Sequence, residues 1–192
     1  MAKAFLTWPA GILAPCLFAS TALAQDFESA YTSLDLGQCH QQPLDPDDPL
    51  GGGVWWCQGY DGIPVRVAEG DLRFLVSFGP NAATEPAASQ TLAQFNRIHA
   101  TLEWRVAIDP ASGNRTPIAT ILRYFLQNDA GPEGQVLVVT KLGGPGQVCH
   151  VGYVDALLNT DANVLGRRVA EAGAAQFDCS QHQPAYYGVA PQ

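Results

Sequence analysis

The residues best suited to acid–base chemistry in this chain are a few histidines, and their spacing assembles no catalytic set. The four beyond the N-terminal segment are His40, His99, His150 and His182. Only His150 falls within a predicted strand, where a side chain can be held rigidly. A catalytic base also needs a positioned partner. Asp155 follows on the same strand, but five residues along a strand place two side chains on opposite faces.

Three carboxylates could complete a hydrolase site with His150. Glu69 and Asp71 resemble a glycosidase acid/base pair, but they flank a glycine in a predicted turn, where acidic residues favour solvent. Glu103 alternates with Arg105 on a later strand, which is equally the pattern of a cross-strand ion pair. The hydrolase motifs G-x-S-x-G and H-E-x-x-H are absent. An envelope hydrolase that uses His150 and these carboxylates is therefore kept as an alternative.

Cysteine and histidine are adjacent twice, at Cys39-His40 and Cys149-His150. Metal sites built from these residue types usually contain a C-x2-C pair, which this chain lacks. Neighbouring side chains on a strand also point to opposite faces, so one ion could not reach both. We expect no metal and no cofactor.

An export signal occupies residues 1–24. Lys3 opens a short positive segment, an apolar stretch follows, and Ala22-Leu23-Ala24 has the small-x-small pattern of a signal-peptidase site. The mature chain is expected to start at Gln25 and to be periplasmic or secreted. Cys16 raises lipid attachment as a competing interpretation, but the preceding proline fits that processing site poorly.

Export places the remaining cysteines in an oxidising compartment. They are Cys39, Cys57, Cys149 and Cys179. An even number predicts two disulfides with three possible connectivities. We favour Cys39–Cys57 and Cys149–Cys179 because each pair brackets a local unit, and each bridge is worth about 3 kcal/mol in the chain-entropy model.

Aromatic residues on a predicted strand offer a binding surface. Trp55 and Trp56 are adjacent, so one should fill the core while the other covers a loop or faces solvent. With Tyr60, they could form a platform for a sugar or a protein partner. Together with the acidic residues of the preceding loop, the predicted binding residues are Trp55, Trp56, Tyr60, His150, Asp45, Asp47 and Asp48.

The loop before this strand is rich in proline, glycine and aspartate. Three prolines and three glycines within residues 41–53 exclude regular structure. Its Asp45, Asp47 and Asp48 lack the alternation and distal glutamate of an EF-hand loop. The segment is interpreted as a solvated surface loop, or as the inserting element of an inhibitor.

The hydrophobic pattern and the turn residues of the chain predict one α+β domain over residues 25–179. A disordered tail is expected over 180–192. About seven mostly antiparallel strands should form meanders, with two helices packed on the sheet. The strands are expected at 54–60, 63–67, 72–78, 101–108, 118–126, 136–142 and 148–154, with a tight hairpin turn at Asp61-Gly62. The helices are expected near 84–99 and 161–176, the second with Arg167, Arg168 and Glu171 facing outward. Residues 26–36 are expected to form a short helix that turns into an extended segment.

The amino-acid composition of the chain limits the classes of partner that it can bind. The chain is 47% hydrophobic and 15% charged, with formal charge −8, and loss of the leader removes Lys3 and no acidic residue. An acidic protein gains nothing from counterion release on nucleic acid, so nucleic-acid binding is not expected. No second apolar run reaches the roughly 20 residues that cross a bilayer, so the mature chain should carry no transmembrane segment.

Short blocks of the sequence resemble small exported proteins of Gram-negative bacteria that have no assigned activity. The blocks are Trp56-Cys57-Gln58-Gly59-Tyr60, Glu69-Gly70-Asp71-Leu72-Arg73, Thr101-Leu102-Glu103-Trp104-Arg105 and Val148-Cys149-His150-Val151. The resemblance implies a periplasmic location and supplies no catalytic residues.

These observations favour a non-catalytic exported binding protein that recognises an envelope protein or a glycan. A small inhibitor of a lytic enzyme or protease is the first alternative, with the loop 45–53 as its inserting element. The envelope hydrolase is the second.

Overall fold

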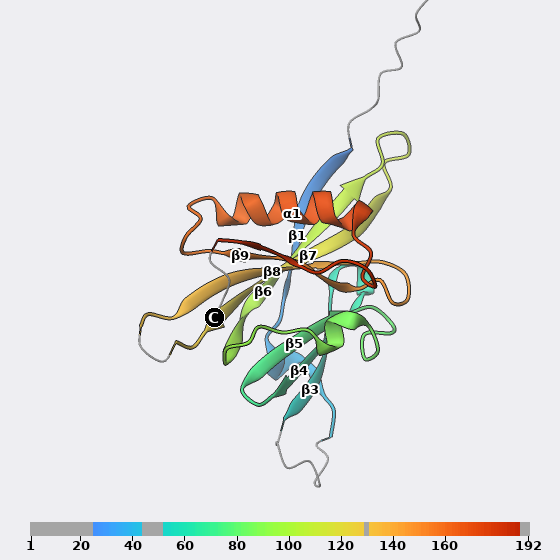
Figure 1. Ribbon diagram of the computed structural model, residues 1–192. Coiled ribbons are helices and arrows are strands. Elements are labelled where there is room, and N and C mark those ends of the chain that lie inside the picture. Colours follow the sequence, from blue (N-terminus) through green and yellow to red (C-terminus); the bar gives the residue numbers. More distant parts are fainter. Residues whose placement is uncertain (1–24, 44–51, 129–130, 189–192) are drawn as a thin grey trace, which may run out of the picture.

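The computed structural model describes residues 25–43, 52–128 and 131–188, which form ten strands, one α-helix and three short 3-10 turns. Figure 1 shows three layers, with the helix above a six-stranded sheet and a four-stranded sheet below. The prediction of an α+β fold with about seven strands and two helices is therefore wrong, because the described residues are mostly β and contain one α-helix. All seven predicted strands are present, but the sequence prediction missed three more and placed a helix where these residues have none.

The six-stranded sheet forms the middle layer. Its order is β1 (Asp26–Ser33), β6 (Asn96–Ile108), β7 (Arg115–Leu126), β8 (Gly134–Lys141), β9 (Cys149–Asp155) and β10 (Ala185–Tyr187). Neighbouring strands are antiparallel except β9 and β10, which are parallel. The central strand β7 is apolar on both faces because both faces are covered: Leu122 and Tyr124 face the smaller sheet and Ile121 packs with the helix.

The smaller sheet contains β2 (His40–Gln41), β3 (Gly53–Gln58), β4 (Pro64–Gly70) and β5 (Arg73–Phe78). The turn between β3 and β4 contains Asp61 and Gly62, with φ of 51° and 75°. The carbonyl of Tyr60 accepts the N–H of Ile63 across it at 3.1 Å. Positive φ at both central residues is what the Asp-Gly pair predicts.

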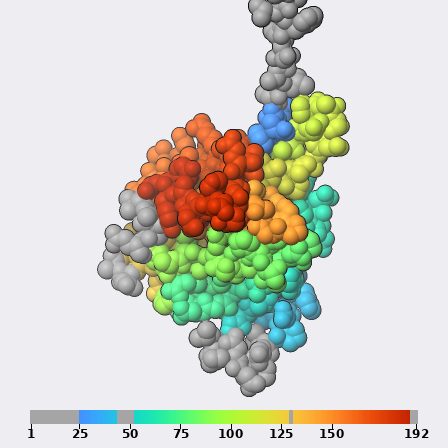
Figure 2. Space-filling view, turned by 45° about the vertical axis from the view of Figure 1, so that its right-hand side comes forward, coloured from blue at the N-terminus to red at the C-terminus, as the bar shows by residue number. Residues whose placement is uncertain are grey.

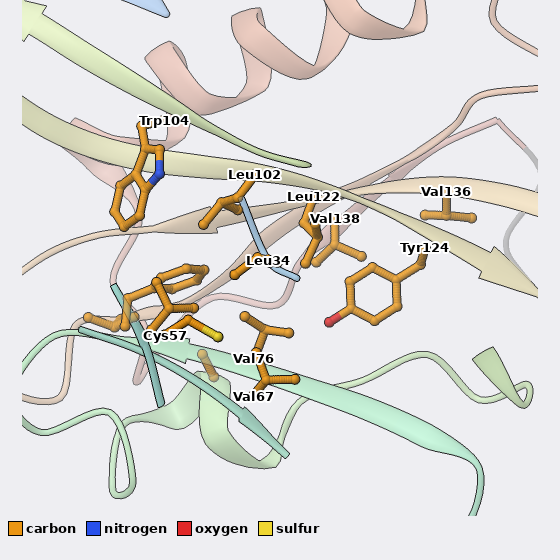
Figure 3. Packing of buried hydrophobic residues seen from close by; sticks show 14 of the residues in the cluster. Leu34, Cys57, Val67, Val76, Leu102, Trp104, Leu122, Tyr124, Val136 and Val138 are labelled. Atoms are coloured by element: carbon orange, nitrogen blue, oxygen red, sulfur yellow. The ribbon is translucent and has the colours of Figure 1, made fainter. Parts of the chain in front are cut away.

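The main hydrophobic core lies between the two sheets (Figure 3). Trp104 from β6 is fully buried and meets Phe78 from β5 edge to face, with ring centroids 5.7 Å apart. Its indole N–H donates to the hydroxyl of Thr32 at 2.8 Å, so the polar atom of this large side chain is satisfied. Burial of such rings fixes how the two sheets lie against each other.

A second core joins helix α1 (Ala162–Gln176) to the middle layer. In Figure 2 the orange and red C-terminal part lies above the green segment around residues 80–100. The helix spans the predicted range, but the prediction that Arg167 and Glu171 face solvent is wrong. Arg167 donates to Glu103 at 2.6 Å, and Arg105 donates to Glu171 at 2.7 Å. These ion pairs tie the helix to β6.

Residues 84–99 form no α-helix. The chain makes a 3-10 turn at Pro86–Ser89, runs extended, and enters β6 at Asn96. The segment bonds to neighbouring strands: the N–H of Ala87 donates to Val148 O at 2.9 Å, and the side chain of Gln90 accepts the N–H of His150 at 2.8 Å. Tertiary hydrogen bonds thus override an apolar repeat of helical period.

Both ends of the described chain are strands, which corrects two further predictions. Residues 26–33, expected to begin as a helix, form β1 along β6. Residues 185–187, assigned to a disordered tail, form β10. Tyr186 of β10 packs on Tyr153 with centroids 4.8 Å apart, and Asn159 donates to the carbonyl of Tyr187 at 3.1 Å. Paired aromatic residues hold a segment whose polar composition alone indicates disorder.

The structure joins Cys39 to Cys57 and Cys149 to Cys179, the pairing that the sequence favours. Two disulfides are compatible with a protein outside the cytoplasm. Within the described ranges, no helix is long and apolar enough to cross a membrane. The predicted leader at residues 1–24, Cys16 and the acidic residues Asp45, Asp47 and Asp48 lie outside the described residues.

Candidate functional site

An open cleft of about 660 Å³ lies where the start of β3 and the β4–β5 hairpin approach the end of β7. Four aromatic side chains from separate segments line it: Trp55, Phe74, Phe95 and Phe125. Polar side chains stand among them, including Glu69, Arg97, Asn128 and Glu133. We call this site the aromatic cleft.

Trp55 enters the cleft because of the glycine two residues before it. Alternate residues of a strand share a face, so Gly53 and Trp55 point the same way. The indole lies across Gly53, and a β-carbon there would stand 2.7 Å from Cζ2 of the ring. Only glycine leaves room for this orientation.

The β4–β5 hairpin brings Leu72 to the rim. Asp71 and Leu72 form the tip, with φ of 51° and 57°, a region that leucine rarely occupies. Glu69 accepts the N–H of Leu72 at 3.1 Å, while Leu72 O accepts the N–H of Asn96 at 2.9 Å. The tip is therefore fixed to β6 while the Leu72 side chain stays 60% exposed beside the cleft. Held strain of this kind is found at functional positions.

Asn96 connects two aromatic residues of the cleft lining, Phe74 and Phe95. This side chain is buried; its Oδ1 accepts the N–H of Phe74 at 2.9 Å and its Nδ2 donates to the carbonyl of Gln94 at 2.9 Å. A single amide thus fixes the backbone beside Phe74 and next to Phe95. The geometry of the cleft is set before any ligand arrives.

The charges in the cleft are largely balanced. The Arg97 guanidinium lies 3.9 Å from the centroid of Phe125 and donates to both oxygens of Glu133 at 2.9 Å. At the rim, Arg73 lies 4.9 Å from the Phe95 ring and pairs with Asp71. Stacked and paired guanidinium groups extend the flat aromatic surface and leave no free positive charge on these two arginines.

The predicted aromatic platform does not converge. Trp55 lines the aromatic cleft, but Trp56 follows it on the opposite face of β3, paired with Arg66 and His40 in neighbouring strands. Tyr60 lies beyond the other end of β3, where its ring is 6.3 Å from Trp104. No motif in the sequence marks the other residues of the cleft, Phe74, Phe95, Phe125, Arg97 and Glu133. Phe74 alternates with buried Val76 and Phe78, which indicates the face of β5 on which it lies. No local pattern indicates the strand order that brings the cleft residues together.

His150 is a buried core residue. It is 1% exposed, and burial lowers the pKa of its imidazole to about 3. Its Nδ1 lies 2.9 Å from the hydroxyl of Tyr153, and in the described chain no partner reaches Nε2. A bulge at β8–β9 places His150 and Tyr153 on one face although they are three residues apart. The imidazole cannot meet a substrate at the surface.

The carboxylates considered with His150 have structural partners instead. Glu69 holds the β4–β5 turn, Asp71 pairs with Arg73, and Glu103 pairs with Arg167. Among the residues that the structure describes, no group of three histidine, cysteine, aspartate or glutamate side chains could hold a metal ion. The geometry therefore does not bring together the residues of the hydrolase alternative.

Comparison with known proteins yields no relative: no family model, no curated protein and no solved structure matches the chain.

Proposed function

We propose that this chain is an exported, non-catalytic binding protein that holds a neutral oligosaccharide of the cell envelope in the aromatic cleft. The observation that carries the proposal is the cleft itself, in which four aromatic side chains and several amide and carboxylate groups line one open volume of about 660 Å³. Apolar walls with a few polar groups are typical of ligand sites.

Sugar rings match these surfaces chemically. A pyranose has a face of C–H groups that packs on an aromatic ring, and a rim of hydroxyls that donate and accept hydrogen bonds. Trp55 and Phe95 supply aromatic surface. Glu69 and Asn128 supply acceptors and an amide donor at the same cleft.

The charge balance favours a neutral ligand. Arg97 is already paired with Glu133, and Glu69 adds a further carboxylate without a cation in the described ion pairs. An anionic ligand would meet this carboxylate and a protein of overall charge −8. The leader pattern at residues 1–24 and the two disulfides support a periplasmic or secreted location.

Titration calorimetry against a panel of neutral oligosaccharides tests the proposal, with chitotetraose, cellotetraose and maltotetraose as the first probes. At least one should bind, and Trp55→Leu should weaken it about tenfold through loss of ring contact. The matched control is Trp56→Leu, which removes the neighbouring indole on the other face of β3 and should bind normally. Absence of binding across the panel, or equal binding by both variants, would overturn the proposal.

A further inference from the structure

A second pocket lies at the opposite ends of the strands that form the aromatic cleft. Its volume is about 500 Å³, and it is lined by the end of β5, the start of β7 and the turn that follows β8. Phe74 and Phe125 mark the cleft ends of β5 and β7, whereas Phe78 and Thr116 mark the ends at this pocket. The two sites share no lining residue.

Proline dominates the walls of this pocket. Pro64, Pro80, Pro117 and Pro145 line it together with Ile63 and Leu142. A proline has no N–H, so these residues bring apolar rings and no hydrogen-bond donor. A ligand here meets mostly apolar surface, with Asn81 and Thr116 as neutral polar side chains of the lining and Glu85 as its charged group.

Glu85 is the carboxylate of this lining and is only 5% exposed. Its Oε1 accepts the N–H of Gly146 at 3.1 Å and its Oε2 accepts the N–H of Val148 at 3.2 Å. Across the described ranges no lysine, arginine or histidine forms an ion pair with it. Two backbone N–H groups position the carboxylate but bring no full positive charge, and a buried carboxylate is ordinarily paired.

We propose that this proline-walled pocket is a second binding site, specific for a small organic ammonium ion with an apolar body. The ammonium group pairs with Glu85, and the apolar body fills the space between the proline rings. Each Glu85 oxygen has lone pairs beyond the one used by a backbone N–H, so both existing hydrogen bonds are kept. The charged pair forms in a largely apolar environment, where it is stronger than in water. This site is independent of the aromatic cleft and goes beyond the proposed oligosaccharide binding.

The test compares phenethylamine with 2-phenylethanol, which has nearly the same shape and no charge, by NMR titration of the mature protein. Phenethylamine should bind about tenfold more tightly than the alcohol and shift signals of the residues around Glu85. In Glu85→Gln this preference for the amine should disappear. Equal affinity for the two probes, or no binding of phenethylamine, contradicts the proposal.

Glu85→Gln turns one carboxylate oxygen into an amide donor and can weaken the turn that follows β8, so a steric variant accompanies it. Gly144 lines the pocket, and a β-carbon there has no atom within 4 Å. Gly144→Leu should fold normally, keep Glu85 and lower the affinity for phenethylamine about fivefold or more by narrowing the pocket. The control is Gly131→Leu, which adds the same side chain at an equally open position in the aromatic cleft and should leave amine binding unchanged. Equal affinity in the two leucine variants would place the amine elsewhere and overturn the assignment.

Discussion

The indole of Trp55 lies across the α-carbon of Gly53, two residues earlier on the same face of β3, and occupies the space where a side chain at 53 would stand. The pair therefore behaves as one unit: the missing side chain at 53 allows the ring at 55 to lie along the strand.

Gly53→Ala should push the Trp55 ring out of position. We expect a loss of about 1–3 kcal/mol in the free energy of unfolding, the usual cost of overpacking, together with loss of oligosaccharide binding. Gly70→Ala is the matched control, since a β-carbon at Gly70 meets no atom within 4 Å. Urea denaturation and calorimetry measure both effects. If Gly53→Ala matches the parent in both measurements, the packing of Trp55 on Gly53 does not shape the cleft.

The buried imidazole of His150 should make stability depend on pH. Burial lowers the pKa of His150 to about 3, whereas the unfolded chain has the ordinary value of 6.5. Between these values the unfolded state binds the proton and the native state does not, so the free energy of unfolding falls as pH falls below 6.5. The loss should reach about 2 kcal/mol by pH 5 and grow by about 1.4 kcal/mol for each further unit.

The measurement is urea denaturation of the parent and of His150→Phe between about pH 7 and pH 5, a range above the titration of ordinary carboxyl groups. The parent should lose stability relative to the variant as the pH decreases, and should be fully stabilised above pH 6.5. Parallel curves for the two proteins would show that His150 is accessible to protons in the native state.

Two ion pairs of different exposure should contribute differently to the free energy of unfolding. The side chain of Glu103 is 11% exposed and pairs with Arg167 at 2.6 Å, whereas that of Glu133 is 43% exposed and pairs with Arg97. Glu103→Ala leaves a half-buried guanidinium and the hydroxyl of Ser29 without their acceptor, so it should cost about 2–4 kcal/mol. Glu133→Ala should cost about 1 kcal/mol or less. Chemical denaturation of both variants checks this order, and a reversed order would refute the role given to Glu103 in fastening the helix.

The Cys149–Cys179 disulfide should control whether β10 stays ordered. It closes a sequence separation of 30 residues and fixes the chain shortly before Ala185–Tyr187. Replacing both cysteines by serine should cost about 3–4 kcal/mol in the chain-entropy model. Hydrogen exchange should then be faster at Tyr186 than in the parent, while β7 and β8 change less. Unchanged protection at Tyr186 would show that its contact with Tyr153 is sufficient.

Local patterns in the sequence predicted those parts of the fold that depend on neighbours along the chain. Alternation located β7, and the Asp61-Gly62 pair located a turn with positive φ at both residues. The segment 84–99 was mistaken for a helix because its apolar repeat has helical period, whereas its structure depends on hydrogen bonds to β5 and β9. Those partners are distant in sequence, and no local signal reveals them.

In the candidate site, too, the residues that local patterns identify differ from those that only the tertiary structure brings together. Trp55 was found because paired tryptophans are conspicuous, but strand alternation does not say which of Trp55 and Trp56 would face a cleft. Phe125 and Arg97 reach the site through the register of β6 and β7, which pairs Arg97 with Phe125. That pairing joins two segments that are distant in the sequence, so no local pattern indicates it. Tertiary geometry therefore assembled the cleft from residues that carry no motif.

The most direct test of the aromatic cleft uses the indole N–H signals of the three tryptophans in the described chain, Trp55, Trp56 and Trp104. They are assigned in ¹⁵N-labelled protein of residues 25–192 by comparing the parent with the single variants Trp55→Leu and Trp56→Leu. The signals of the parent are then followed during titration with the oligosaccharide that binds most tightly in calorimetry. We expect the Trp55 signal to shift and to saturate with the calorimetric affinity, while the signals of Trp56 and of buried Trp104 stay in place. A saturating shift of Trp56 with Trp55 unchanged would contradict this expectation.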